Sequence, residues 1–197
     1  MSLAAATASS SVSNTLIGAT GPKISSLVSR ASSGTSVRTV GPLVDAKGRE
    51  KVVELVGDAV GRGATVRVGG EPVDGPGWFY RPTVLTDVPL EARLTKEEIF
   101  GPVAPISVFD TDDEAVAAAN DTEFGLVSYL FTENVNRALR VSEALESGMV
   151  GLNTGLVSNP AAPFGGIKQS GLGREGGAVG IEEYLETKYV AVGLKAL

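Results

Sequence analysis

The sequence predicts an α/β fold with a largely parallel sheet, on three observations. Between about residues 64 and 153, strand-like segments alternate with helix-like segments. The helix-like segments start at residues that cap helices and stop at glycines. The 197 residues are 43% hydrophobic and 20% charged, as in ordinary globular domains of roughly 100–200 residues. A chain of this kind can bury a substantial core.

The first helix is expected to follow Asp45, whose side chain can cap it. Valine, leucine and alanine then recur at helical spacing until Gly61 and Gly63. Residues 64–68 have the composition of a short strand. These features predict a helix followed directly by a strand.

A second extended segment follows a loop. Glycine and proline are dense over residues 69–77, which predicts a turn. Residues 79–88 then read as extended chain, and Pro82 within them favours an edge strand because proline cannot donate to a sheet ladder.

Two further strand and helix rounds follow. Residues 103–109 predict a strand, Thr111 a helix cap, and Gly125 a stop before a strand over 127–131. Asn134 is expected to open the next helix, and residues 149–153 the next strand. The predicted apolar face of that helix comprises Val135, Ala138, Leu139, Val141, Ala144 and Leu145.

The end of the chain differs in pattern. A glycine-rich loop from Asn153 to about Gly171 precedes a predicted helix over 178–185. A final strand is expected over 188–192, and it has no local partner. Such an edge favours pairing with another domain or subunit.

Residues 1–40 differ in composition from the rest. They are rich in serine and carry no acidic residue, whereas all 23 acidic residues lie at Asp45 or beyond. We expect a poorly ordered leader, because no apolar period is sustained there. A transit-like targeting segment, a disordered extension and a segment foreign to the protein are open alternatives. The leader leaves localisation open between the favoured cytoplasm and an organelle.

Composition excludes several classes of function. The chain has no cysteine and no histidine, so thiolate nucleophiles, imidazole bases and the usual zinc sites are excluded within it, and no metal site is predicted. A net charge of −6 and a pI near 4.8 argue against nucleic-acid binding. No apolar run reaches the roughly 18 residues of a membrane span.

A glycine pattern near the end of the chain imitates a nucleotide-binding motif. Gly171, Gly173 and Gly176 fit the dinucleotide fingerprint by spacing. That fingerprint functions only where a buried strand leads into the glycines, and here residues 160–170 read as loop. We therefore interpret these glycines as turn-forming.

Two other segments are candidates for chemistry. Glu97 and Glu98 precede an aromatic residue and a Gly-Pro stop, and a carboxylate there could act as a base or bind a diol, although exposed pairs of this kind are usually solvated surface. The loop over 153–175 alternates glycines with a single aromatic. It could form the wall of a pocket or a simple structural connection.

Three motifs together resemble the aldehyde dehydrogenase superfamily in order and spacing. They are Glu97-Glu98-Ile-Phe-Gly-Pro-Val103, Asn120-Asp-Thr-Glu-Phe-Gly-Leu126 and Pro163-Phe-Gly-Gly-Ile-Lys-Gln-Ser-Gly-Leu-Gly-Arg-Glu175. Residues 151–159 and 180–189 resemble the succinate-semialdehyde dehydrogenase branch. The resemblance runs from Gly41 to the end and corresponds to roughly the last third of such an enzyme; residues 1–40 do not share it. It implies a partial catalytic domain over 41–187, with an oligomerisation strand and tail over 188–197.

The family oxidises aldehydes to acids. A cysteine thiolate attacks the carbonyl, hydride passes to NAD or NADP, and a glutamate-activated water hydrolyses the thioester. By the family's spacing the cysteine would fall near or before residue 1, and the cofactor domain upstream. The chain therefore offers no catalytic residue, and we expect it to be inactive alone.

The resemblance assigns roles to residues that are present. Glu98 resembles the carboxylate that binds the nicotinamide ribose, and Phe100 the aromatic beside it. Ser158 stands where this branch would bind the far carboxylate of the semialdehyde, and Phe164 where an aromatic lines the substrate channel. The arginines that would neutralise that carboxylate belong to segments that the chain lacks.

The resemblance also implies a structural ion pair and an oligomer. Arg174 and Glu186 would pair between the glycine-rich loop and the closing strand, with two surface charges as the alternative. The strand over 188–192 resembles one that bridges subunits, which implies a homo-oligomer. A non-catalytic module that pairs through this strand with itself or a full-length relative is the second hypothesis. NAD and NADP are not distinguished, nor is the exact aldehyde.

Overall fold

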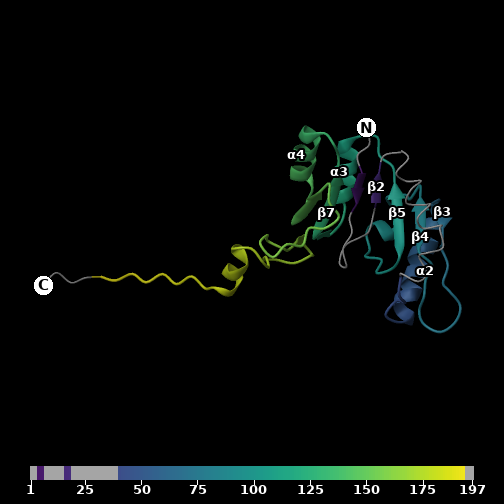
Figure 1. Ribbon diagram of the computed structural model, residues 1–197, viewed down its shortest axis with the longest axis horizontal. Coiled ribbons are helices and arrows are strands. Elements are labelled where there is room, and N and C mark those ends of the chain that lie inside the picture. The colour runs from purple at the N-terminus through teal and green to yellow at the C-terminus, as the bar shows by residue number, and fades with distance from the viewer. Residues whose placement is uncertain (1–3, 7–15, 19–39, 194–197) are drawn as a thin grey trace.

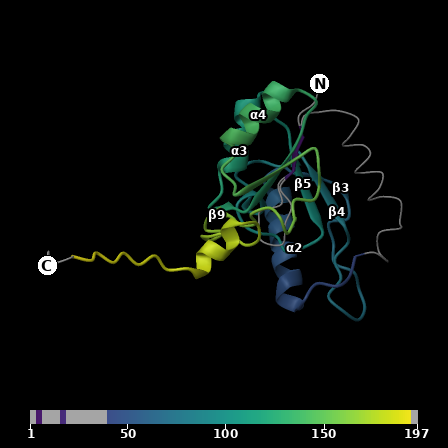
Figure 2. The same cartoon turned by 60° about the vertical axis from the view of Figure 1, so that its left-hand side comes forward.

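One sheet organises the molecule. The computed structural model describes residues 4–6, 16–18 and 40–193, with side chains from residue 40 onward. Seven strands lie in the order β3-β4-β5-β2-β1-β7-β8, with α2 against one half and α3 and α4 against the other (Figures 1 and 2). The strands are β1 (Ala4–Ala6), β2 (Leu16–Gly18), β3 (Thr65–Val68), β4 (Thr83–Thr86), β5 (Val103–Ser107), β7 (Val127–Phe131) and β8 (Met149–Leu152).

The prediction of a largely parallel sheet is not confirmed. β4–β5, β5–β2 and β7–β8 pair in parallel, whereas β3–β4, β2–β1 and β1–β7 are antiparallel. The strand–helix–strand unit of β7, α4 and β8 has the expected parallel neighbours. β5 and β7, which also flank a helix in sequence, are separated by β2 and β1. Two strands from the start of the chain thus change the sheet that alternation predicted.

β1 and β2 come from the segment predicted as a poorly ordered leader. Ala5 pairs with Leu130 of β7 and with Ile17 of β2, and Leu16 pairs with Ile106 of β5. These two short strands therefore join the halves of the sheet. Each has three residues, too few to show a period in sequence. The remaining residues before Val40 lie outside the described part of the chain.

The strand after Pro82 is not at an edge. β4 lies between β3 and β5, and all four of its residues are buried. Pro82 directly precedes Thr83, the first residue of β4, where a missing donor interrupts no ladder. The edge prediction was wrong because proline's position at the start of the strand, rather than within it, decides its effect.

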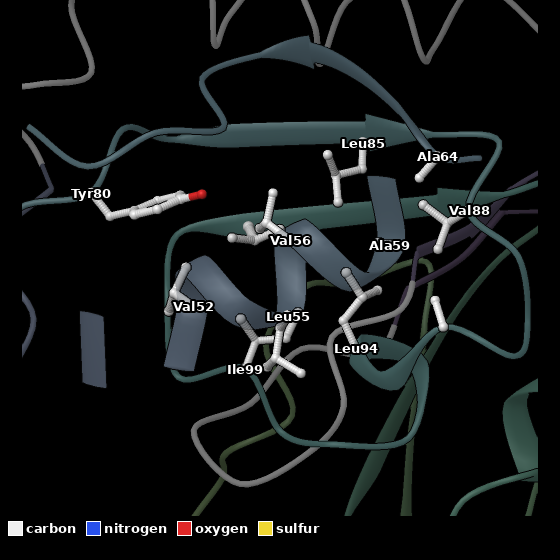
Figure 3. Close-up of a cluster of buried hydrophobic side chains, with 12 residues drawn as sticks. Val52, Leu55, Val56, Ala59, Ala64, Tyr80, Leu85, Val88, Leu94 and Ile99 are labelled. Carbon is white, nitrogen blue, oxygen red and sulfur yellow. The ribbon is translucent and has the colours of Figure 1, made fainter. Parts of the chain in front are cut away.

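Helix α2 (Ala46–Gly61) forms as predicted and carries the larger core. Asp45 caps it by accepting a hydrogen bond from the Gly48 amide at 2.7 Å. Figure 3 shows its buried face against β4 and β5. The buried residues of this cluster are Val52, Leu55, Val56, Ala59, Ala64, Tyr80, Leu85, Val88, Ala92, Leu94, Ile99 and Val103. Burial raises the pKa of Tyr80 to about 12, with a smaller contribution from Glu71.

Helices α3 (Asp112–Asn120) and α4 (Val135–Ala144) cover the other half of the sheet. Thr111 and Glu114 form a capping box on α3, and Asn134 caps α4 by accepting from the Arg137 amide at 2.9 Å. A second, smaller core lies here, formed by Ala115, Leu130, Val141 and Leu145.

The predicted apolar face of α4 is partly wrong. Val135 is 70% exposed and Leu139 is 62% exposed, and Ala144 is exposed as well. Ala138 and Val141 are buried, as is Leu145 just after the helix. The sheet therefore contacts a narrower stripe of the helix than the spacing of apolar residues suggested.

The end of the chain extends away from the sheet (Figures 1 and 2). The 3₁₀ helix η3 (Val179–Tyr184) replaces the α-helix predicted over 178–185, and none of its residues is buried. The strand predicted over 188–192 does not form, and residues 181–193 are all exposed. A strand needs a neighbour for its backbone groups, and the described residues provide none at this point.

Candidate active-site walls

The segment around Glu98 is anchored to α2. Glu97 pairs with Arg93 of η2 (Arg93–Thr95) at 2.7 Å, and the Arg93 amide donates to Asp58 of α2 at 2.9 Å. The hydrogen bond from Arg93 lowers the pKa of Glu97, and the Arg93 amide lowers the pKa of Asp58. Of the two adjacent glutamates, Glu97 is therefore committed to a structural ion pair.

Glu98 and Phe100 are placed differently from each other. Glu98 is half-buried, its Oε1 atom is buried, and its carbonyl accepts a hydrogen bond from Lys51 at 2.7 Å. Ile99 is 1% exposed and anchors the segment in the core, whereas Phe100 is 59% exposed. The φ of Phe100 is +48°, an uncommon value for a bulky residue, and it turns the backbone directly after the buried Ile99. A carboxylate and an aromatic ring thus stand two residues apart at the surface of the larger core.

The loop that carries Phe164 is closed by a short clamp. The Phe164 amide donates to the Glu175 carbonyl and the Glu175 amide to the Phe164 carbonyl, each at 2.7 Å. Phe164 is half-buried, and Ser158, earlier in the loop, is exposed. The loop starts at Asn153, whose side-chain amide bonds the main chain of Thr132 at 2.8 Å in both directions. The expected substrate residues therefore lie on an ordered loop.

One hollow of about 380 Å³ lies beside this loop. It is lined by Leu126, Phe164, Gly165, Gly166, Ser170, Leu172, Gly173, Arg174, Glu175, Glu183 and Tyr184. Ser158 and the residues of the Glu98 segment are not among them. The Glu98 segment and the loop over 153–175, the two walls of the candidate site, therefore do not share this hollow.

The motifs are connected instead through the loop after α3. Lys96, two residues before Glu98, donates to the Asp121 carbonyl at 2.9 Å and forms an ion pair with the Asp121 carboxylate. Lys168, four residues after Phe164, donates to the Asn120 carbonyl at 2.9 Å. All three sequence motifs thus meet at residues 120–122.

Arg174 and Glu186 do not form the expected ion pair in this structure. The Arg174 guanidinium donates to the carbonyls of Gly166 at 2.8 Å and Gly173 at 2.7 Å, and its amide bonds Glu183. Glu186 is exposed, beyond η3. Residues 185–193 are exposed and lie in no helix or strand, so the carboxylate that reaches Arg174 is Glu183 of η3 rather than Glu186.

The glycine pattern over 171–176 has the geometry of turns. The φ values of Gly171, Gly173 and Gly176 are +103°, +82° and +68°, in the region that glycine tolerates. A Cβ on Gly173 would lie 2.9 Å from the Glu183 carboxylate. The segment before these glycines is the two-residue strand β9 (Ile167–Lys168), which pairs with β6 (Phe124–Gly125) outside the main sheet. The local structure thus agrees with turn-forming glycines rather than a nucleotide fingerprint.

Sequence reasoning missed the connecting residues. Lys168 and Asn120 lie within the quoted motifs and Lys96 directly precedes one of them, but the motifs assign none of the three a role. A lysine two to four residues from a candidate site residue in two separate motifs was the available signal. Across the described residues, no cluster of acidic side chains could hold a metal ion, and no helix has the length and apolarity to cross a bilayer.

Comparisons with known proteins place this geometry in a family. Succinate-semialdehyde dehydrogenase (NADP+) of Escherichia coli is 53% identical over 79% of the chain, and glutarate-semialdehyde dehydrogenase of Pseudomonas aeruginosa is 56% identical over 79%. The chain spans 32% of the length of each of these relatives. A solved lactaldehyde dehydrogenase structure superimposes with a TM-score of 0.83 at 33% identity, covering 90% of this chain and 39% of that one.

The similarity also reaches further back than the motifs indicated. The family model for aldehyde dehydrogenases matches residues 6–190, so its match begins before Gly41, where the resemblance seen in the sequence starts. With both walls, the connecting loop and nearly the whole length covered by this match, the chain belongs to the aldehyde dehydrogenase family.

Proposed function

We propose that this chain supplies the nicotinamide-ribose wall and one aldehyde-facing loop of an NAD(P)-dependent aldehyde dehydrogenase, and that it does not turn over alone. The observation that supports this most directly is the meeting of three motifs at residues 120–122. Two lysines hold the Glu98 segment and the Phe164 loop against the same turn. The proposal therefore rests on contacts between the motifs in the structure as well as on their sequence similarity to the family.

The residues present fit part of a nicotinamide nucleotide. A carboxylate can accept hydrogen bonds from both hydroxyls of a ribose, and Glu98 holds its carboxylate at the edge of the core. Phe100 offers an exposed ring two residues further along the chain. The nicotinamide cofactor, when bound, supplies the acceptor for hydride. Glu98 and Phe100 would orient the ribose end, and the choice between NAD and NADP lies with other residues.

The substrate class proposed is a short aldehyde with an anionic far end. The names of the two relatives, succinate-semialdehyde and glutarate-semialdehyde dehydrogenase, both denote aldehydes that carry a carboxylate. The exposed hydroxyl of Ser158 could donate to such a group, and Phe164 would pack against the carbon chain. The charge of the carboxylate would require a cation from another segment.

The chemical step lacks its nucleophile in this chain. Aldehyde oxidation through a thioester needs a sulfur to attack the carbonyl, and none of the 197 residues is cysteine. A serine would need a base within hydrogen-bond reach, and histidine is also absent from the sequence. The chain is thus expected to bind at most parts of the reactants.

The test is direct. The purified chain is mixed with succinate semialdehyde and either NAD+ or NADP+, and reduced cofactor is followed by absorbance beside the E. coli relative as the active control. We expect the relative to turn over and the chain to match the uncatalysed rate. Cofactor reduction by the chain above that rate would refute the claim of inactivity.

A second candidate function is association through the end of the chain. Ile181, Tyr184, Leu185, Tyr189 and Val190 are all more than half exposed, and the backbone after η3 is unpaired. Clustered exposed apolar side chains of this kind mark interaction surfaces. The partner would be a second copy of the chain or a full-length relative.

Light scattering after size exclusion tests this candidate. We expect the native chain to elute as an oligomer and the Tyr189→Ser/Val190→Ser variant to shift toward the monomer. Val53→Ser, on the exposed side of α2, is the matched control for loss of an exposed apolar residue. A native chain that is monomeric alone and in a mixture with the E. coli relative would eliminate this function.

A further inference from the structure

We propose that Lys96 and Lys168 are positioning residues that set the spacing between the Glu98 segment and the Phe164 loop. Three successive main-chain carbonyls, of Asn120, Asp121 and Thr122, accept hydrogen bonds from these two ammonium groups. Lys168 binds the first and third, at 2.9 and 3.3 Å, and Lys96 binds the second, at 2.9 Å. The Glu98 segment and the Phe164 loop are therefore both bound to this one turn.

The receiving turn is itself fixed. The side-chain amide of Asn120 donates to the Ala144 carbonyl and accepts from the Glu146 amide, each at 2.8 Å. Glu146 in turn pairs with Lys168 at 2.5 Å. Asn120, Glu146 and Lys168 thus form a closed ring of contacts between the ends of α3 and α4. A turn held in this way can serve as a reference point for the two segments bound to it.

Each lysine acts together with other attachments of its own segment. The loop of Lys168 has other attachments, since Ser170 accepts from the Gly125 amide at 3.0 Å and the Gln169 amide donates to Glu123 at 2.8 Å. Lys96 connects the Glu98 segment to the turn from the other side. The Glu98 segment is also anchored elsewhere, by Ile99 in the core and by the bond from Lys51 to the Glu98 carbonyl. Loss of either lysine should therefore loosen the spacing in part, and loss of both should loosen it most.

The chemistry of the lysine side chain suits this role. An ammonium group has three donors, so one lysine can hold several carbonyls at once. Methionine has a similar length and no donor, whereas arginine retains the charge and donors. Substitution by methionine removes the donors but keeps the length, and substitution by arginine keeps both. Comparing the two therefore separates loss of the hydrogen bonds from loss of side-chain bulk. The roles of the two walls rest on the proposed function, but their spacing does not.

The absence of cysteine from the sequence allows the spacing to be measured. Cysteines introduced at the exposed positions Glu91 and Gln169 would carry spin labels on the two sides. Pulsed electron resonance on the full chain then gives the distribution of distances between them. We expect a narrow distribution in the parent, a broadened one in Lys96→Met, and recovery of the narrow form in Lys96→Arg.

Controls separate positioning from general stability. Lys47→Met removes an exposed lysine of α2 and should leave the distribution unchanged. Lys168→Met should also broaden it, and the double variant should broaden it most. If Lys96→Met fails to fold, Asp121→Asn, which removes only the ionic part of the contact, takes its place with a smaller broadening expected. An unchanged distribution in every folded variant, including the double variant where it folds, would overturn the proposal.

The same labelled samples keep the two proposals apart. Titration with NADPH, followed by its fluorescence, reports on the cofactor wall. Broadening without nucleotide binding would support the positioning role while weakening the proposed function. Nucleotide binding with an unchanged distance distribution in the variants would support the proposed function and weaken the positioning role.

Discussion

Gly101 brings the main chain of the Glu98 segment close to Val52 of the core. A Cβ atom at this residue would lie 2.5 Å from Val52 Cγ2 and 3.4 Å from its Cγ1. Val52 is fully buried on α2, and a valine on a helix has one strongly preferred rotamer, so it cannot turn away. Gly101→Ala should therefore push the segment of Glu98 and Phe100 away from the helix. Overpacking of this kind costs about 1–3 kcal/mol of unfolding free energy.

A double-mutant cycle tests the cause. Val52→Ala alone should lower the unfolding free energy by about 1.5–3 kcal/mol, because removing two buried methyl groups leaves a cavity in the core. In the Gly101→Ala/Val52→Ala double variant the clashing methyl groups are gone, so the loss should be smaller than the sum by at least about 0.5 kcal/mol. Gly57→Ala is the matched control on the same helix, with no atom within 4 Å of the added Cβ. It should stabilise the chain by about 0.5–1 kcal/mol.

Urea unfolding followed by circular dichroism supplies these free energies, provided that the slopes agree among variants. Gly101→Ala with an unchanged midpoint would show that the segment yields without cost. A double variant whose loss equals the sum of the two single losses would show that Val52 is not what the methyl group meets. Either result would refute the proposed close packing beneath Glu98.

Three further predictions concern the fold. The desolvation that raises the pKa of Asp112 is outweighed by its hydrogen bonds to Arg137 and Arg140, and its pKa is lowered. The stability that this carboxylate contributes is present above its unfolded pKa and lost as pH falls through the lower folded value, so Asp112→Asn should flatten the acid limb of a pH–stability curve. Leu145→Ala should cost about 2–5 kcal/mol and Leu139→Ala less than about 0.5 in the same urea assay, because one side chain is buried and the other exposed. Ala5→Pro should lower the thermal midpoint sharply, since Ala5 lies in a strand with neighbours on both sides and proline cannot donate there.

The helices could be predicted from sequence because their signals are local. Asp45, Thr111 and Asn134 each cap a helix through a hydrogen bond to an amide three residues later. Such a bond depends on a few neighbouring residues and little on the rest of the molecule. The strand over 127–131 was likewise placed at its observed bounds.

The order of the strands could not be predicted in this way. β5 and β7 read as neighbours in a parallel sheet, but two three-residue strands separate them. Strand order is decided by contacts between residues far apart in the chain, and a three-residue strand leaves no period in the sequence. The exposure of Val135 and Leu139 has the same origin, because the angle at which α4 meets the sheet is not encoded in its spacing.

The candidate site shows the same division. The motifs identified the segments of Glu98 and Phe164, since family motifs preserve residue type and order. The residues that bring those segments together act through main-chain carbonyls, which every residue possesses. No side-chain pattern in residues 120–122 predicts that lysines will donate hydrogen bonds to their carbonyls. Contacts of this type become visible only once the backbone is in place.

The end of the chain leaves large apolar side chains exposed to solvent. Leu172 is 99% exposed and Tyr189 is 88% exposed, although side chains of this size each gain about 1.5–3 kcal/mol or more when buried. The main sheet of the same chain buries residues of comparable size almost completely. The chain therefore has a core, and these exposed side chains lie outside it. The backbone over residues 186–193, after η3, lies in no helix or strand, and pairing it would satisfy its polar groups while covering the side chains there. An extended, apolar and unpaired segment gains on both counts from the edge of another sheet, which is the physical basis for testing association at this end first.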